Sequence, residues 1–123
     1  MLNEVIQLRN YAHLGDAVWE IFVREYVVFL AHNSKALHKM TTDRVNAEFQ
    51  KNVLDFLMPN LTPDEQELAR RGRNLPIPVG RKAIQQSYRK ATALEVLVGY
   101  WYLHDKNRLN KIFDICKSLE DFS

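Results

Sequence analysis

Two carboxylates in otherwise apolar, helix-like stretches are the residues of this sequence best placed to do chemistry. Glu95 stands between Leu94 and Val96, and Asp16 lies in a second such stretch far away in the chain. Because an unpaired buried charge is costly, Glu95 either lies at a rim in water or is held near a partner group. The second alternative makes Glu95 a candidate functional residue.

A glycine accompanies each of these carboxylates. Gly99 follows Glu95 by one helical turn, and Gly15 directly precedes Asp16. Glycine inside a helix costs roughly 1 kcal/mol relative to alanine, so its presence needs a reason. One interpretation is a simple packing notch. The sharper one is a notch that lets a second helix, with its own carboxylate, approach Glu95.

The elements that must position these residues are predicted to be helices. Apolar residues recur at three- and four-residue spacings, and no stretch shows the sustained alternation typical of strands, so we expect an all-α fold. A threonine, a proline and a glutamate at positions 62, 63 and 65 have the spacing of a capping box. The expected helices span residues 2–8, 11–31, 35–40, 42–57 with Thr42 or Asp43 as N-cap, 62–72, 87–103 and 109–119, with an extended loop at 74–80 and a turn at 104–107.

The two helices that carry the carboxylates each have a predicted buried stripe. In the first, the stripe comprises Leu14, Val18, Ile21, Phe22, Val28 and Phe29. In the second, it comprises Leu94, Leu97, Val98 and Trp101.

Size and composition favour one compact domain over residues 1–123. The chain has 123 residues, of which 46% are hydrophobic, which is enough to bury a core. We find neither a membrane-length apolar run nor a basic-then-apolar signal pattern, so we expect a cytoplasmic protein. A single cysteine, Cys116, cannot form an internal disulfide, and we interpret it as a half-buried apolar residue of the last helix.

Positive charge is concentrated in one segment. The net charge is only +2, but seven of the 17 Lys and Arg residues lie between Arg70 and Lys90, where there is no Asp or Glu. The rest of the chain therefore holds ten basic residues against all 15 acidic ones. This uneven distribution points to a polyanionic partner more strongly than the total net charge does, although solvated basic faces are also common.

Five ordered motifs give the sequence a specific resemblance. HLGDAVWE (13–20) and TALEVLVGYWYL (92–103) look like the two signature helices of the ribonuclease III catalytic domain. LHKMTTDRVNAEFQ (37–50), ARRGRN (69–74) and SYRKATALE (87–95) resemble segments of the Mini-ribonuclease III family, whose members consist of the catalytic domain alone. The resemblance covers residues 11–103.

That resemblance implies an all-helical homodimer that cleaves double-stranded RNA with Mg²⁺, typically in maturing the large-subunit (23S) ribosomal RNA precursor. A ribosomal protein is a further candidate partner. It also implies that Asp16 and Glu95 are the catalytic, metal-binding carboxylates. The chain departs from the broader ribonuclease III pattern at Ala12 and Thr92, where that pattern has a glutamate and an aspartate. The Mini-type pattern tolerates both departures.

The basic segment supplies the expected RNA contacts. Proteins recognise RNA duplexes mainly through phosphates, 2′-hydroxyls and helix shape, which calls for arginine and lysine on loops. The candidate RNA-binding residues are Arg70, Arg71, Arg73, Asn74, Arg81, Lys82 and Arg89. The candidates for a dimer surface are Trp19, Phe22, Trp101 and Tyr102, although for each single aromatic a place in the core is favoured.

Two other functions compete with the nuclease. The first is a noncatalytic, dimeric RNA-binding relative of the ribonuclease III domain, against which the presence of both Asp16 and Glu95 argues. The second is a helical protein-interaction module with an incidental basic loop. Glu20 is interpreted as a solvated glutamate, and we assign no histidine to the site because hard Mg²⁺ disfavours imidazole.

Overall fold

The structure, a computed structural model, describes residues 3–76 and 85–122, and these residues fold into helices without any strand. This confirms the predicted all-α class. The helices are α1 (Glu4–Val27), α2 (Ser34–Val45), α3 (Ala47–Leu57), α4 (Pro63–Arg73), α5 (Gln85–His104) and α6 (Lys106–Lys117), with short 3₁₀ helices η1 (Met58–Asn60) and η3 (Glu120–Phe122).

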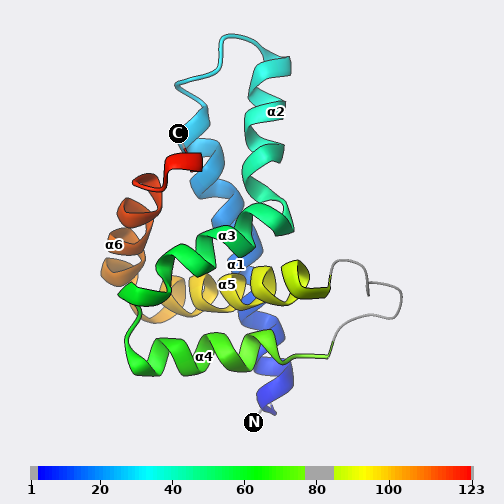
Figure 1. Cartoon of the computed structure of the whole chain (residues 1–123), viewed down its shortest axis with the longest axis vertical. Coiled ribbons are helices and arrows are strands. Elements are labelled where there is room, and N and C mark those ends of the chain that lie inside the picture. The colour runs from blue at the N-terminus through cyan, green and yellow to red at the C-terminus, as the bar shows by residue number, and fades with distance from the viewer. Residues whose placement is uncertain (1–2, 77–84, 123) are drawn as a thin grey trace.

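Helix α5 is the element against which most of the others pack. Helix α1 crosses it, α3 lies along one side, and α4 runs antiparallel to it on another (Figure 1). The predicted stripe of Leu94, Leu97, Val98 and Trp101 is buried, as are Ala93 and Val96. A helix that is apolar on nearly all sides belongs in the middle of a bundle, and α5 occupies that place.

The first helix, Glu4–Val27, takes the place of the two helices that were predicted for residues 2–8 and 11–31. The side chain of Asn3 caps α1 by accepting a hydrogen bond from the Ile6 backbone N–H at 2.9 Å. The helix ends at Val27, earlier than expected, and Phe29 beyond it is 91% exposed. Ile21 is also exposed, because the buried face of α1 passes instead through Phe22, whose ring stacks on that of Phe113 in α6. The predicted stripe was therefore wrong at Ile21, Val28 and Phe29.

The boundary between α2 and α3 also differs from the prediction. Helix α2 continues to Val45, so Thr42 and Asp43 lie within it and neither caps α3. The Thr42 hydroxyl instead donates to the Lys39 carbonyl at 3.1 Å, a bond that threonine makes readily inside a helix. Asn46 is the N-cap of α3 and accepts from the Phe49 N–H at 2.8 Å.

The start of α4 is as predicted. The Thr62 hydroxyl accepts from the Glu65 N–H at 3.2 Å, and the Glu65 carboxylate accepts from the Thr62 N–H at 2.8 Å, which completes the capping box. The helix ends at Arg73, one residue beyond the expected Gly72, with Asn74 as C-cap. Between α5 and α6 the expected four-residue turn is reduced to Asp105, which caps α6.

Cys116 is fully buried in the core, deeper than the half-buried position expected for it. Burial raises the pKa of its thiol to about 12, so the thiolate is scarce at neutral pH. Across the residues that the structure describes, no helix combines the length and apolar character needed to cross a bilayer.

A polar network ties α4 to α5 and α6. The Glu65 carboxylate accepts hydrogen bonds from the Trp101 indole at 2.9 Å and from the Arg108 guanidinium at 2.9 and 2.8 Å, and its side chain is only 13% exposed. Burial alone would raise the pKa of Glu65, but the bonds from Arg108, the Thr62 N–H and Trp101 outweigh it and lower this pKa to about 2.

Glu65→Gln should therefore reduce the free energy of unfolding by about 2 kcal/mol at pH 7, the scale of a charge-assisted hydrogen bond. The pKa of Glu65 is lower in the folded state than its ordinary value of 4.5. The stabilisation that depends on the negative charge of Glu65 is therefore present above pH 4.5 and is lost as pH falls towards 2. Urea unfolding at pH 7 and pH 3 measures this. Glu67→Gln, which alters an exposed pair with Arg70, is the control. An equal loss at both pH values would contradict the prediction.

Candidate active site

Two glycines let α1 and α5 approach until their backbones touch. A Cβ atom built on Gly15 would fall on the Glu95 carbonyl oxygen and lie 2.9 Å from the Gly99 backbone nitrogen. One built on Gly99 would fall on the Tyr11 carbonyl oxygen. Backbone atoms cannot rotate away as a side chain can, so neither position has room for a larger residue. The predicted notch at Gly99 is confirmed as the place where a second helix meets α5.

This crossing brings the Asp16 and Glu95 carboxyl groups together. Asp16 is exposed on α1 and Glu95 is partly buried on α5, and the two side chains interact directly. Burial, and then the hydrogen bond and negative charge of Asp16, raise the pKa of Glu95 to about 8. Without a cation, the pair therefore holds a proton at neutral pH.

A third side chain, Gln50 of α3, reaches the same carboxylate. It lowers the pKa of Glu95, against the larger effects of burial and Asp16. Gln50 is 3% exposed, and its Nε2 atom is buried without a well-aligned hydrogen-bond partner among the described residues. The amide therefore lies close to Glu95 but falls short of a good hydrogen bond.

The donor set fits a hard divalent cation. Mg²⁺ prefers oxygen ligands and keeps several waters, so two carboxylates at a solvent-exposed rim are a suitable protein contribution. Two carboxyl groups that must share a proton when alone would both ionise beside a cation. No group of three or more His, Cys, Asp and Glu side chains with metal-binding geometry exists within residues 3–76 and 85–122.

Four of the seven predicted RNA-binding residues lie where α4 ends. The side chain of Arg70 pairs with Glu67, and Arg71 pairs with Glu4 at 2.9 Å. Arg73 and Asn74 are exposed beside them. Arg81 and Lys82 lie outside the described residues.

Arg89, the seventh predicted residue, contacts the chain just after α4. Its guanidinium donates to the carbonyls of Arg73 at 3.1 Å and Leu75 at 3.3 Å, while Arg9 of α1 donates to the Pro76 carbonyl at 2.5 Å. Two arginines from different helices thus hold the segment that leaves α4. Arg9 was not identified from the sequence, and its position in the chain offered no signal.

Two surface hollows among the described residues are lined by neither Asp16 nor Glu95. One, of about 600 Å³, is lined by Phe22, Tyr26 and Phe29, and another, of about 480 Å³, lies around Tyr100 and His104. A pair at an open rim is accessible to a large substrate that lies across the surface.

Gln50 was also missed as a site residue, although a signal existed. It ends the LHKMTTDRVNAEFQ motif and stands in register with Val53, Leu54 and Leu57 on the inner face of α3. A glutamine on an apolar face must find a polar partner inside the protein. The sequence alone did not show that the partner is Glu95.

A helical fold in which two carboxylates meet across a glycine-lined crossing is that of the ribonuclease III class, and residues 9–106 match the ribonuclease III domain. A Mini-ribonuclease 3 of Gloeobacter violaceus is 39% identical over 115 residues, which cover 94% of this chain and 85% of that protein. One from Enterococcus faecalis is 34% identical, covering 85% and 83%. This chain belongs to the Mini-ribonuclease 3 family.

A solved structure agrees with this assignment. The crystal structure of a protein from Fusobacterium nucleatum matches with a TM-score of 0.76 and 31% identity, covering 85% of this chain and 86% of that one. The predicted resemblance is thereby confirmed, and so is the class of enzyme, an endoribonuclease. Ribonuclease III-type proteins act on double-stranded RNA, generally depend on a divalent metal and typically dimerise.

Proposed function

We propose that this chain is a Mg²⁺-dependent endoribonuclease that cleaves double-stranded RNA, with Asp16 and Glu95 as the catalytic carboxylates, and that its substrate is the precursor of the large-subunit (23S) ribosomal RNA. The observation that carries the proposal is the contact between these two carboxyl groups at the α1–α5 crossing. The family supports the reaction class.

The two carboxylates bind and orient the cation in this proposal. When bound, Mg²⁺ supplies charge neutralisation at the scissile phosphate and activates water for in-line attack. Glu95 must give up the proton that it holds at neutral pH before both of its oxygens are available as ligands. Hydrolysis leaves a 5′-phosphate and a 3′-hydroxyl.

The experiment is a cleavage assay on a long RNA duplex with EDTA and then with added Mg²⁺. We expect cutting only with Mg²⁺, with products that carry 5′-phosphates. A protein that binds the duplex but leaves it intact at every Mg²⁺ concentration would instead be the noncatalytic relative. A precursor RNA with a paired 23S stem, compared with an unrelated duplex of equal length, tests the substrate.

In this proposal, the basic residues around the end of α4 bind the phosphates of the RNA. Replacing Arg73 and Arg81 by alanine should weaken duplex binding and lower the slope of log affinity against log salt by about 2, because each lost phosphate contact lowers it by about 1. Arg73 is chosen because Arg70 and Arg71 are already engaged by glutamates. Filter binding at several salt concentrations measures the slope.

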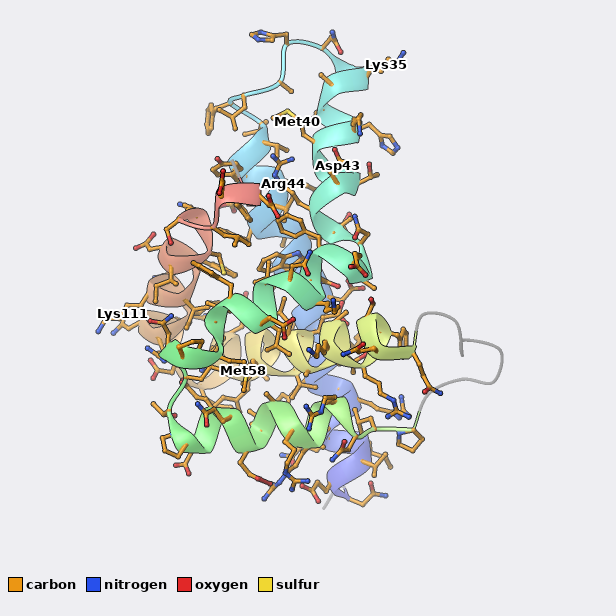
Figure 2. The ribbon with its side chains drawn as sticks, viewed as in Figure 1. Lys35, Met40, Asp43, Arg44, Met58 and Lys111 are labelled. Atoms are coloured by element: carbon orange, nitrogen blue, oxygen red, sulfur yellow. The ribbon has the colours of Figure 1, made fainter. Side chains whose placement is uncertain are left out.

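The matched control removes the same charge elsewhere. Lys35 lies in the first turn of α2 and Lys111 projects from α6, both far from the end of α4 (Figure 2). Lys35→Ala with Lys111→Ala should leave the slope unchanged. If both double variants shift the slope equally, the change comes from the lower net charge of the protein, and the RNA-binding surface lies elsewhere.

A homodimer is part of the proposal because duplex strands run in opposite directions and a two-fold axis places two sites in matching opposite orientation. Of the four aromatic candidates for the dimer surface, Trp19, Phe22 and Trp101 lie in the core, as favoured. Tyr102 is 37% exposed and stays a candidate. Sedimentation of the parent and of Tyr102→Glu tests the assembly.

A ribosomal protein partner and a cytoplasmic location are also proposed. The effect of the ribosomal protein on the cleavage rate tests the first, and cell fractionation tests the second.

A further inference from the structure

We propose that Gln50 is a positioning residue for the metal site: its side-chain amide orients the Glu95 carboxylate so that this group and Asp16 can bind one divalent cation together. The proposal rests on the function proposed for Asp16 and Glu95. It adds a third helix to the site, because Gln50 comes from α3, which lies beside α5 where α1 passes across it (Figure 1).

The burial of Gln50 is the first argument. A glutamine that is 3% exposed has given up nearly all of its contact with water, yet its Nε2 atom lacks an aligned hydrogen bond within the described part of the chain. A buried donor left unpaired costs about 1–3 kcal/mol. Its neighbours Phe49, Val53 and Leu54 are apolar and buried, so an apolar side chain would suit the packing better.

The interaction of Gln50 with Glu95 is the second argument. Gln50 and Glu95 interact across the α3–α5 contact, and the effect of the amide is to favour the charged carboxylate. Hydrogen bonds to a carboxylate are among the stronger ones that an amide donor can make. An amide that holds one oxygen of Glu95 leaves the other oxygen free to face Asp16.

The chemistry of the side chain is the third argument. A third carboxylate at this position would add negative charge to a pair that already shares a proton, and a lysine or arginine would compete with the cation. A neutral amide can donate without either effect. Groups that orient metal ligands from behind typically change metal affinity by 10–100-fold when they are removed.

The test is the rise in melting temperature produced by Mn²⁺, titrated into the whole protein without RNA. Mn²⁺ stands in for Mg²⁺, and ligand binding to the folded state raises stability in proportion to ln(1 + [L]/Kd), so even millimolar binding is visible. The variant is Gln50→Met, which keeps the length of the side chain and removes the amide, with Gln50→Leu as a second substitution. Asn52→Met, on the exposed side of α3, is the matched control. Glu95→Gln, which lacks one of the two carboxylates, gives the rise in melting temperature that Mn²⁺ produces when the site is disabled.

We expect Gln50→Met to need at least about tenfold more Mn²⁺ for the same stabilisation. Its melting temperature without metal should equal or exceed that of the parent, and its affinity for duplex RNA in EDTA should be unchanged. The same Mn²⁺ response in Gln50→Met and the parent would overturn the proposal, as would a loss confined to metal-free stability. If the parent responds no more than Glu95→Gln, the carboxylate site itself is wrong and the role of Gln50 falls with it.

Discussion

Glu95→Gln is expected to abolish cleavage of an RNA duplex while leaving duplex binding nearly intact. The amide has the shape of the carboxylate but provides no anionic oxygen for a divalent cation. The loss should be at least about 10²–10³-fold in the single-turnover rate, the scale reported for removing one preorganised electrostatic group from an active site. Binding should persist because, in the function proposed above, the arginines near the end of α4 contact the phosphates.

Single-turnover cleavage at saturating enzyme isolates this effect from binding, and filter binding in EDTA measures the affinity separately. Glu20→Gln is the control, since Glu20 lies one turn after Asp16 on α1 and pairs with Arg24 at 2.7 Å on the surface. The control should cut at the parental rate. Normal cleavage by Glu95→Gln would remove Glu95 from the mechanism.

Gly99→Ala is expected to cause a large loss of stability for the addition of a single methyl group. Alanine would gain about 1 kcal/mol in helix propensity over glycine. The added Cβ, however, would fall on the Tyr11 carbonyl oxygen, so α1 and α5 would have to separate. Overpacking that forces backbone shifts typically costs 1–3 kcal/mol, and here we expect more than about 3 kcal/mol, with cleavage lost in whatever fraction stays folded.

Urea unfolding gives this loss directly, and Gly72→Ala provides a graded comparison. A Cβ on Gly72 would lie 3.1 Å from Ala93 Cα and from Val96 Cγ2, a tight but adjustable contact. That variant should stay within about 1 kcal/mol of the parent. If Gly99→Ala is no less stable than Gly72→Ala, the α1–α5 crossing is not held at backbone contact in solution.

Local signals in the sequence were enough for several elements. The capping box at Thr62 and Glu65 involves residues three apart, so its geometry is determined within one helical turn. The buried stripe of α5 was equally clear because its apolar residues cover most of the helix, which leaves little choice of face.

Other elements depended on what lay opposite them. In α1, Ile21 and Phe22 are both apolar neighbours, and only the position of α5 and the carboxy-terminal residues decides that Phe22 is buried and Ile21 is not. Helix α2 could have ended at Thr42. Instead, it continues to Val45, and within it Arg44 donates a hydrogen bond to the Phe122 carbonyl at 2.9 Å, although the two residues are 78 positions apart in the chain.

The sequence by itself therefore determined the helical class, the family and the two carboxylates with their glycines, because these are carried by residue types and short spacings. Only the tertiary structure decided that Gln50 meets Glu95 and that Arg9 and Arg89 bond to the chain just after α4. Those contacts join residues from three different helices. Their existence depends on how buried surfaces fit together, which no spacing along a single helix encodes.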